Sequence, residues 1–405
     1  MHIVTRDIVL LFTTRIIRMF AYGFVSVVLA LYLVASGLSA AGVGAVLTAT
    51  LAGDIFVSLW VTMVADRVGR KNMLLLGSFL MILAGLVFLL TDDPVWITIA
   101  AIIGIVSPSG GEIGPFLSIE QAALSQLVPD SRRTRVFGWY NLAGSFATAG
   151  GALAGGWLAQ WLQNIGLSGL EAYRWIMGGY AACGLALMLL FVFVSRHAEV
   201  VPVAGNPEGA GKRTLGLHRS KSVVFKLSSL FALDAFAGGF VVQSMIAWWL
   251  HVHYGADEGM LGTLFFAANL LAGVSALLAT RLADRIGLVR TMVFTHIPSN
   301  FLLCLVPLMP NFWLAVVMLL LRACISQMDV PARQSYTMAV VAPDERSAAS
   351  GITTVARSVG AAVSPLLGGL LMAYPFLFSV PFFVAGGLKI MYDVMLYKMF
   401  KDMGE

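Results

Sequence analysis

The sequence predicts an all-α membrane protein whose twelve transmembrane helices form two pseudo-symmetric six-helix bundles. Of its 405 residues, 59% are hydrophobic and only 12% are charged. At about 20 apolar residues per bilayer crossing, this content corresponds to about twelve spans. Uncharged runs at residues 73–90 and 177–195 are long enough to cross a membrane as helices. A transmembrane β-barrel would instead carry short alternating segments.

One long polar stretch divides the chain. Residues 196–222 are rich in glycine, proline and charge, which is typical of a linker. We therefore predict an N-terminal six-helix bundle at residues 1–196, a cytoplasmic linker at 197–221 and a C-terminal six-helix bundle at 222–405.

Basic residues gather in alternate connections between the hydrophobic runs. They cluster at residues 67–71, 132–135, 196–221, 285–290 and at Arg346, whereas the opposite connections contain only Arg174. Because basic loops resist translocation, we predict that the first set and both termini are cytoplasmic, in a multi-pass protein of the cell (inner) membrane. These loops also account for the formal charge of +5, so no nucleic-acid partner is expected.

The two halves carry matching motifs in the same order. "ADRVG", which ends at Gly69, returns as "ADRIG", which ends at Gly287. Residues 127–138 match 341–351, and residues 151–156 match 364–369. Such internal duplication is typical of transporters that bind their substrate between two repeats.

At these motifs the chain resembles the major facilitator superfamily (MFS), in its twelve-helix, drug-antiporter-like form. Asp66, Arg67, Gly69, Arg70 and Lys71 match the family signature that follows the second helix, with Thr62 in place of its glycine. The copy at Asp284, Arg285 and Gly287 is degenerate. The resemblance implies that this loop locks the cytoplasmic side, and its charges can form a clasp. The alternative is that the basic residues only set the topology.

A second family motif, from the fifth helix of antiporters, is altered. The fifth helix has Gly151, Ala152, Gly155 and Gly156 without the motif's proline, whereas the eleventh has Ser364, Pro365, Gly368 and Gly369. We predict that these small residues serve close helix packing.

Charges inside membrane helices mark the candidate site. A charge at the bilayer centre costs about 2.5–3.5 kcal/mol, so one that persists usually faces a partner or a wet cavity. The resemblance implies that helices 1, 4, 7 and 10 line that cavity. The predicted substrate and proton pathway comprises Glu112, Glu120, Gln121, Asp234, Gln243, Arg322, Asp329, Arg333 and Gln334. The predicted gating residues are Arg18, Asp54, Asp66, Arg67, Gly69, Arg70, Lys71, Asp284, Arg285 and Arg357.

Two charge pairs are predicted between the halves. Glu112 and Glu120 lie about 80° apart on a helix, so one can take a proton while the other pairs with Arg333. Alternatively, Glu120 and Arg333 merely neutralise each other. Aligning residues 21–25 with 237–241 places Arg18 opposite Asp234, which predicts a gate pair. The alternative is that Arg15 and Arg18 snorkel to the headgroups.

The histidines and cysteines add no strong motif. His251 and His253 precede two carboxylates and could bind a transition metal, but aromatic anchoring of this segment at the membrane interface is the commoner pattern. His296 is interpreted as a packed polar residue. Cys183, Cys304 and Cys324 lie in separate apolar runs, which predicts free thiols.

The function predicted from these features is secondary active transport of a small amphipathic solute by alternating access, as proton-coupled efflux. The alternatives are an uptake symporter for an organic anion, using Arg322 and Arg333, and a non-transporting membrane sensor. No nucleophile, base or metal constellation has a recognisable spacing, so neither an enzyme nor a cofactor is expected. The expected partners are a small-molecule substrate, protons and the lipid bilayer, and the protein is expected to be a monomer.

Overall fold

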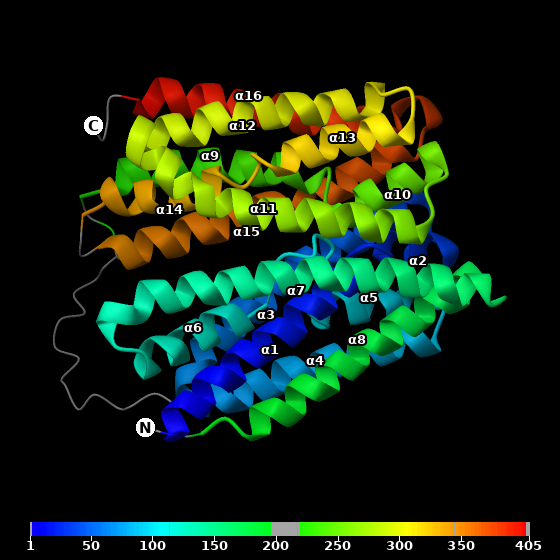
Figure 1. Cartoon of the computed structure of the whole chain (residues 1–405), viewed down its shortest axis with the longest axis horizontal. Helices are drawn as coiled ribbons and strands as arrows, with labels where there is room; N and C mark the ends of the chain where they lie inside the picture. Colours follow the sequence, from blue (N-terminus) through cyan, green and yellow to red (C-terminus); the bar gives the residue numbers. More distant parts are fainter. Residues whose placement is uncertain (1, 113, 196–216, 218, 343–344, 402–405) are drawn as a thin grey trace. The chain divides into compact units, whose positions relative to one another are not determined.

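Helices make up most of the described part of the chain. A computed structural model describes residues 2–112, 114–195, 217, 219–342 and 345–401, and these ranges contain no strand (Figure 1). The first half contains α1 (His2–Ser26), α2 (Leu29–Ala35), α3 (Ala40–Val68), α4 (Arg70–Leu90), α5 (Pro94–Ile103), α6 (Phe116–Leu127), α7 (Asp130–Asn164) and α8 (Gly169–Val192). The second half contains α9 (Lys221–Gly239), α10 (Gln243–Tyr254), α11 (Glu258–Ile286), α12 (Leu288–Leu305), α13 (Phe312–Ala323), α14 (Asp329–Ala339), α15 (Arg346–Met372) and α16 (Val380–Phe400), with 3-10 turns η2 (Val306–Leu308) and η4 (Pro375–Leu377).

The predicted number of crossings is confirmed when interrupted helices are counted once. Among the described residues, nine segments are long and apolar enough to span a membrane. Two shorter apolar helices, α5 and α13, are each continued by a second short helix, α6 and α14. Together with the 35-residue α7, these segments make twelve.

The order of the elements repeats between the halves. An interrupted first helix (α1 and α2) corresponds to α9 and α10, and the interrupted fourth helix (α5 and α6) corresponds to α13 and α14. α3 and α11, each of 29 residues, follow the first interruption in their halves. The duplication seen in the motifs therefore extends to the positions at which helices break.

Two compact units are present, and they do not divide at the linker alone. Unit 1 comprises Met1–Val201 with Val242–Leu270, and unit 2 comprises Pro202–Val241 with Leu271–Glu405. The segment 242–270 joins unit 1 because α10 packs on α2 and the start of α11 packs on α7. The bundle bounds predicted above follow the repeat along the sequence, whereas these units are defined by contacts, so the predicted bounds stay a prediction. Residues 196–216 and 218 of the predicted linker lie outside the described residues.

Glycines with a left-handed backbone connect the second and third helices of each half. Gly69, with φ +104°, ends α3 and immediately precedes α4, and Gly287, with φ +89°, does the same between α11 and α12. A side chain would strain this backbone, whereas glycine adopts it readily. This geometry explains why the glycine of "ADRVG" is retained in "ADRIG".

Small residues bring long helices into contact, as predicted. α1 runs beside α7, and α9 runs beside α15 (Figure 1). A Cβ atom on Gly151 would lie 2.0 Å from the carbonyl oxygen of Phe20, and one on Gly155 would lie 2.2 Å from that of Phe24. Only glycine permits this separation, so close packing accounts for these two residues of the altered antiporter motif.

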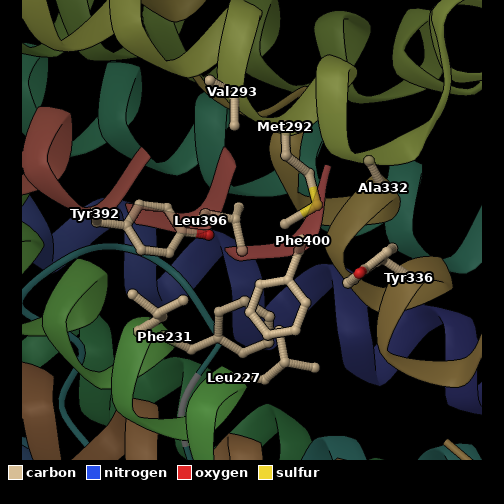
Figure 2. Close-up of a cluster of buried hydrophobic side chains, with 10 residues drawn as sticks. Leu227, Phe231, Met292, Val293, Ala332, Tyr336, Tyr392, Leu396 and Phe400 are labelled. Carbon is tan, nitrogen blue, oxygen red and sulfur yellow. The ribbon is translucent and has the colours of Figure 1, made fainter. Parts of the chain in front are cut away.

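Unit 2 has an apolar core next to its charged residues. Figure 2 shows side chains from α9, α12, α14 and α16 meeting in one cluster. Tyr392 and Phe231 contact each other there, with ring centroids 6.5 Å apart. Large apolar side chains elsewhere face outward, including Phe56 and Phe225, which are 74% and 75% exposed. An exterior of this kind suits hydrocarbon rather than water.

Candidate functional site

The fourth transmembrane helix is interrupted by a long unwound segment. The described residues between α5 and α6, which are 104–112, 114 and 115, are not helical, and Pro108 and Pro115 lie among them. Positive φ angles occur at Gly110 (+69°), Gly114 (+81°) and Ile105 (+53°). Because a β-branched residue rarely adopts that conformation, Ile105 stores about 1–3 kcal/mol of backbone strain.

Donors on other helices form hydrogen bonds with carbonyl groups of the unwound segment. Tyr180 donates its hydroxyl hydrogen bond to the carbonyl oxygens of Gly104 and Ile105, at 3.1 and 2.9 Å. The Ser244 N–H donates to the carbonyl of Pro108 at 3.0 Å. Non-helical backbone at membrane depth requires such partners. The segment is therefore a supported structure, and it positions its charged residue, Glu112.

A buried charge cluster in unit 1 is built around Arg18. This arginine is fully buried and donates two hydrogen bonds of 2.8 Å to the two carboxylate oxygens of Glu120. Its Nε donates to Glu112 at 3.1 Å, and Arg15 also pairs with Glu112. Thr14 and Tyr140 donate their hydroxyls to Glu120. Two carboxylates thus neutralise two arginines in one bidentate network.

Two expectations about this cluster are wrong. Arg15 and Arg18 do not snorkel, because they are only 5% and 0% exposed and pair with acids. Glu112 does not lie on a helix, so the expected 80° relation to Glu120 does not apply. The two acids converge on Arg18 because the prolines and glycines unwind the intervening backbone.

A second polar group of unit 1 meets the unwound segment. Gln243, at the start of α10, donates to Ser26 Oγ at 2.7 Å and accepts from Asn269 Nδ2 at 3.1 Å. A Cβ on Gly110 would lie 3.0 Å from Ser26 Oγ and 3.5 Å from Gln243 Nε2. The predicted pathway residue Gln243 therefore packs on the break in helix 4. Gln121 is half-buried on α6.

Unit 2 has its own charge cluster, centred on Asp234 of α9. Three cations converge on this buried aspartate: Lys389 at 2.6 Å, Arg357 at 3.1 Å and Arg333 at 3.2 Å. Arg333 also pairs with Asp329 at 2.9 Å, one helical turn away on α14. The predicted residues Asp234, Asp329, Arg333 and Arg357 are thus brought together. Gln334, by contrast, is exposed on α14.

A histidine links this cluster to a second aspartate. His296 Nδ1 lies 2.9 Å from Asp393 Oδ1, and its Nε2 lies 3.9 Å from Asp234. Asn300 donates to the other oxygen of Asp393 at 3.1 Å. His296 is therefore packed and hydrogen-bonded, as interpreted, but it also contacts an acid of the candidate site.

Arg322 differs from the cations that bind Asp234. It lies in the last turn of α13, directly before the break between α13 and α14. Its Nε is buried without a hydrogen-bond partner, and it forms no ion pair among the described residues. Asp234 and Asp329 lie within electrostatic reach of its guanidinium.

The signature loop after the second helix contacts the ends of other helices of unit 1. Lys71 donates to the carbonyl oxygens of Val192 and Val194, at 2.5 and 3.1 Å, where α8 ends. Arg70 donates to Gln126 of α6 at 3.0 Å. The loop therefore ties α4 to α6 and α8. The side chains of Thr62, Asp66 and Arg67 lie outside the described part, so the complete clasp stays a prediction.

Replacing Lys71 by methionine is expected to lower the free energy of unfolding by about 0.3–1 kcal/mol. The substitution removes the cation that binds the last carbonyls of α8. Thermal unfolding in detergent measures the change, and Lys226→Met, on an exposed position of α9, is the matched control. Equal melting temperatures for Lys71→Met and the wild type would contradict the capping role.

The remaining predictions concern the second motif copy and pairs across the units. Asp284 and Arg285 are exposed at the end of α11, so their gating role stays a prediction. The pairs Arg18–Asp234 and Glu120–Arg333 join residues of different units and also stay predictions.

The outer histidines have local roles. His251 Nδ1 lies 2.8 Å from the carbonyl of Ala256, and His253 stacks on Trp249. In the ranges that the structure covers, no group of three or more potential ligands could hold a metal ion. Cys183, Cys304 and Cys324 are free thiols, as predicted.

Several residues of the two clusters were not in the predicted site. Three of them contact an acid of the predicted site: Arg15, Tyr140 and Lys389. The fourth, Asp393, contacts His296. The intramembrane charge of Lys389 and Asp393 was a usable signal, but their helix is the twelfth, outside the four that the resemblance assigns to the cavity. Tyr140 carries no charge, so composition offered no signal for it.

Comparison with known proteins identifies the class of this chain. The sequence profile described as Major Facilitator Superfamily matches residues 11–252 and 228–403, which together cover nearly the whole chain. The chain therefore belongs to the Major Facilitator Superfamily.

Individual relatives agree with this assignment. Uncharacterized membrane protein YJR124C of Saccharomyces cerevisiae is 28% identical, over 98% of this chain and 94% of the relative. Multidrug resistance protein MdtG of Proteus mirabilis is 24% identical, over 76% of this chain and 73% of the relative. The crystal structure of a mutant of the nucleoside transporter NupG superimposes with a TM-score of 0.76 at 14% identity, covering 97% of this chain and 100% of that one. The fold is accordingly that of MFS transporters.

Proposed function

We propose that this chain is a secondary active transporter that exports a small amphipathic solute across a cell membrane in exchange for protons. The observation that carries proton coupling is Asp54 of α3. This acid lies within a candidate membrane span and forms no ion pair in the described part of the chain. Glu112 and Glu120 instead each bind arginine.

An unpaired carboxylate at membrane depth favours proton binding. Keeping it ionised there costs about 2.5–3.5 kcal/mol, and a proton removes that cost. Asp54 accepts a hydrogen bond from Ser58 at 3.1 Å, and a Cβ atom on Gly114 of the unwound segment would lie 3.8 Å from Asp54 Oδ1. Protonation of Asp54 removes a negative charge directly beside this segment.

Protonation of Asp54 affects the rest of unit 1 through the unwound segment. Glu112 belongs to that segment and lies within electrostatic reach of Asp54. Loss of the negative charge on Asp54 therefore changes the field at the acid that holds Arg15 and Arg18. In this proposal, proton occupancy of Asp54 selects between two arrangements of the segment, which is how one site biases another.

The energy of one proton is sufficient for useful export. A proton that crosses 100 mV releases about 2.3 kcal/mol, which sustains a solute gradient of roughly fifty-fold. The similarity to a multidrug resistance protein supports an amphipathic solute and the outward direction.

Proteoliposomes with an acidic interior test the proposal. The probes are naphthalenes that carry a sulfonate, a sulfonamide or a trimethylammonium group. The wild type is expected to accumulate at least one probe, and Asp54→Asn to lose accumulation while retaining exchange of labelled for unlabelled probe. Asp54→Glu, which keeps a titratable group, is the matched control and should retain accumulation. Wild-type vesicles that move no probe, or an Asp54→Asn variant that accumulates it normally, would overturn the proposal.

A further inference from the structure

Arg322 combines a permanent charge with an unsatisfied donor. Its Nε is buried and has no hydrogen-bond partner in the described part of the chain, whereas Arg333 and Arg357 each pair with Asp234. A guanidinium does not lose its proton in a protein, so Arg322 cannot escape this cost by becoming neutral. Arg322 is half-buried, but its Nε atom is fully buried, and a buried donor is normally hydrogen-bonded, so the unsatisfied Nε indicates a partner that is not part of the described chain.

The acids near Arg322 are already committed to other cations. Asp234 binds Arg333, Arg357 and Lys389, and Asp329 binds Arg333. With Arg322, the cluster therefore contains four cations but only these two aspartates. Counting Asp393, which contacts His296 and Asn300, still leaves one more cation than acids. This cluster thus carries one more positive than negative charge, which attracts an anion.

The position of Arg322 suits a ligand. It precedes residues 324–328, a series of hydrogen-bonded turns that interrupts the tenth transmembrane helix between α13 and α14, and interrupted helices commonly mark binding regions of transporters. The unsatisfied Nε and one Nη of a guanidinium point in parallel, which matches two oxygens of one anionic group. Arg357, with 32% of its side chain exposed, keeps the charge cluster accessible.

We infer that Arg322 binds the anionic group of the transported solute, so that the substrates of this protein are amphipathic organic anions. This inference rests on the proposed transport function and names its substrate class. The ligand chemistry is a carboxylate, sulfonate or phosphate oxyanion attached to an apolar body, held by Nε and Nη of Arg322 within the positive field of unit 2.

Matched ligands separate charge recognition from apolar binding. Naphthalene-1-sulfonate and naphthalene-1-sulfonamide share their ring, but only the first carries a full negative charge. Calorimetric titration of the purified full chain is expected to give at least about tenfold tighter binding of the sulfonate, because a hydrogen-bonded ion pair is replaced by neutral contacts. The sulfonate should also raise the melting temperature by mass action.

Variants of Arg322 test its role directly. Arg322→Ala is expected to weaken sulfonate binding at least about tenfold and leave sulfonamide binding unchanged. Arg322→Lys keeps the charge but not the parallel donors, so its affinity for the sulfonate should lie between those of Arg322→Ala and the wild type. Arg281→Ala, at an exposed position of α11, is the control. Without ligand, Arg322→Ala should melt no lower than the wild type, because Arg322 makes no ion pair among the described residues that the substitution could remove; a purely structural arginine would lower that temperature.

The outcomes distinguish this inference from the transport proposal. Equal affinity of Arg322→Ala and wild type for the sulfonate, or equal wild-type affinity for sulfonate and sulfonamide, would overturn the anion site even if vesicles accumulate a probe. Sulfonate binding that depends on Arg322 in a protein that moves no probe would instead overturn the transport proposal and leave the anion site standing.

Discussion

Asp234→Asn is expected to destabilise the protein by about 3–5 kcal/mol, because it leaves three cations, two of them buried, without their common acid. Lys389, Arg333 and Arg357 all pair with this carboxylate, which is only 5% exposed. Asparagine keeps the shape of the side chain but not its charge, so the change isolates the electrostatic contribution. Unfolding of the purified protein in detergent, followed by tryptophan fluorescence, measures the effect.

A second substitution shows whether charge is the cause. Asp234→Asn with Lys389→Met removes one of the stranded cations, and this double variant should recover part of the lost stability. Asp284→Asn, exposed at the end of α11, is the control and should change the free energy of unfolding by no more than about 0.5 kcal/mol. An Asp234→Asn variant that unfolds with the wild type would refute the central role of Asp234.

Arg18→Met is expected to cost a similar amount, about 3–5 kcal/mol, in unit 1. Arg18 makes a bidentate pair with Glu120 and also contacts Glu112, and it is fully buried. Methionine fills much of the same volume but leaves Glu120 without a cation. The yield of folded protein and its melting temperature report the loss.

Neutralising the stranded acid should restore stability. Arg18→Met with Glu120→Gln leaves Arg15 paired with Glu112, so the double variant is expected to unfold at a higher temperature than Arg18→Met alone. Arg281→Met at an exposed site of α11 is the control for loss of an arginine. If the double variant were no more stable than Arg18→Met, packing rather than charge would explain the effect of Arg18.

The sequence was sufficient to predict the helical architecture because hydropathy acts locally. Each span needs about 20 apolar residues, and the repeated turn glycines at Gly69 and Gly287 require a backbone that few other residues adopt. Close packing at Gly151 and Gly155 was also predictable, since small residues at short spacing indicate helix contact. Prolines near Glu112 indicated a loosened helix, but not an unwound segment between α5 and α6.

The partners of the buried charges could not be predicted in the same way. The three cations on Asp234 come from α14, α15 and α16, and the sequence places them 99, 123 and 155 residues away. An ion pair between distant helices depends on their packing and rotation, which hydropathy does not specify. Charges that lipid disfavours could therefore be identified as a set, while their pairing required the structure.

The halves have opposite polarity at equivalent helices. In the first half the first helix supplies a base, Arg18, and the fourth an acid, Glu120; in the second half these are an acid, Asp234, and a base, Arg333. Duplication of one ancestral half followed by exchange of both partners would produce this inversion, since a single exchange would have set like charges together. A chimera carrying two copies of the first half would consequently keep Asp54, the proposed proton acceptor, and lack Arg322, the proposed anion-binding residue.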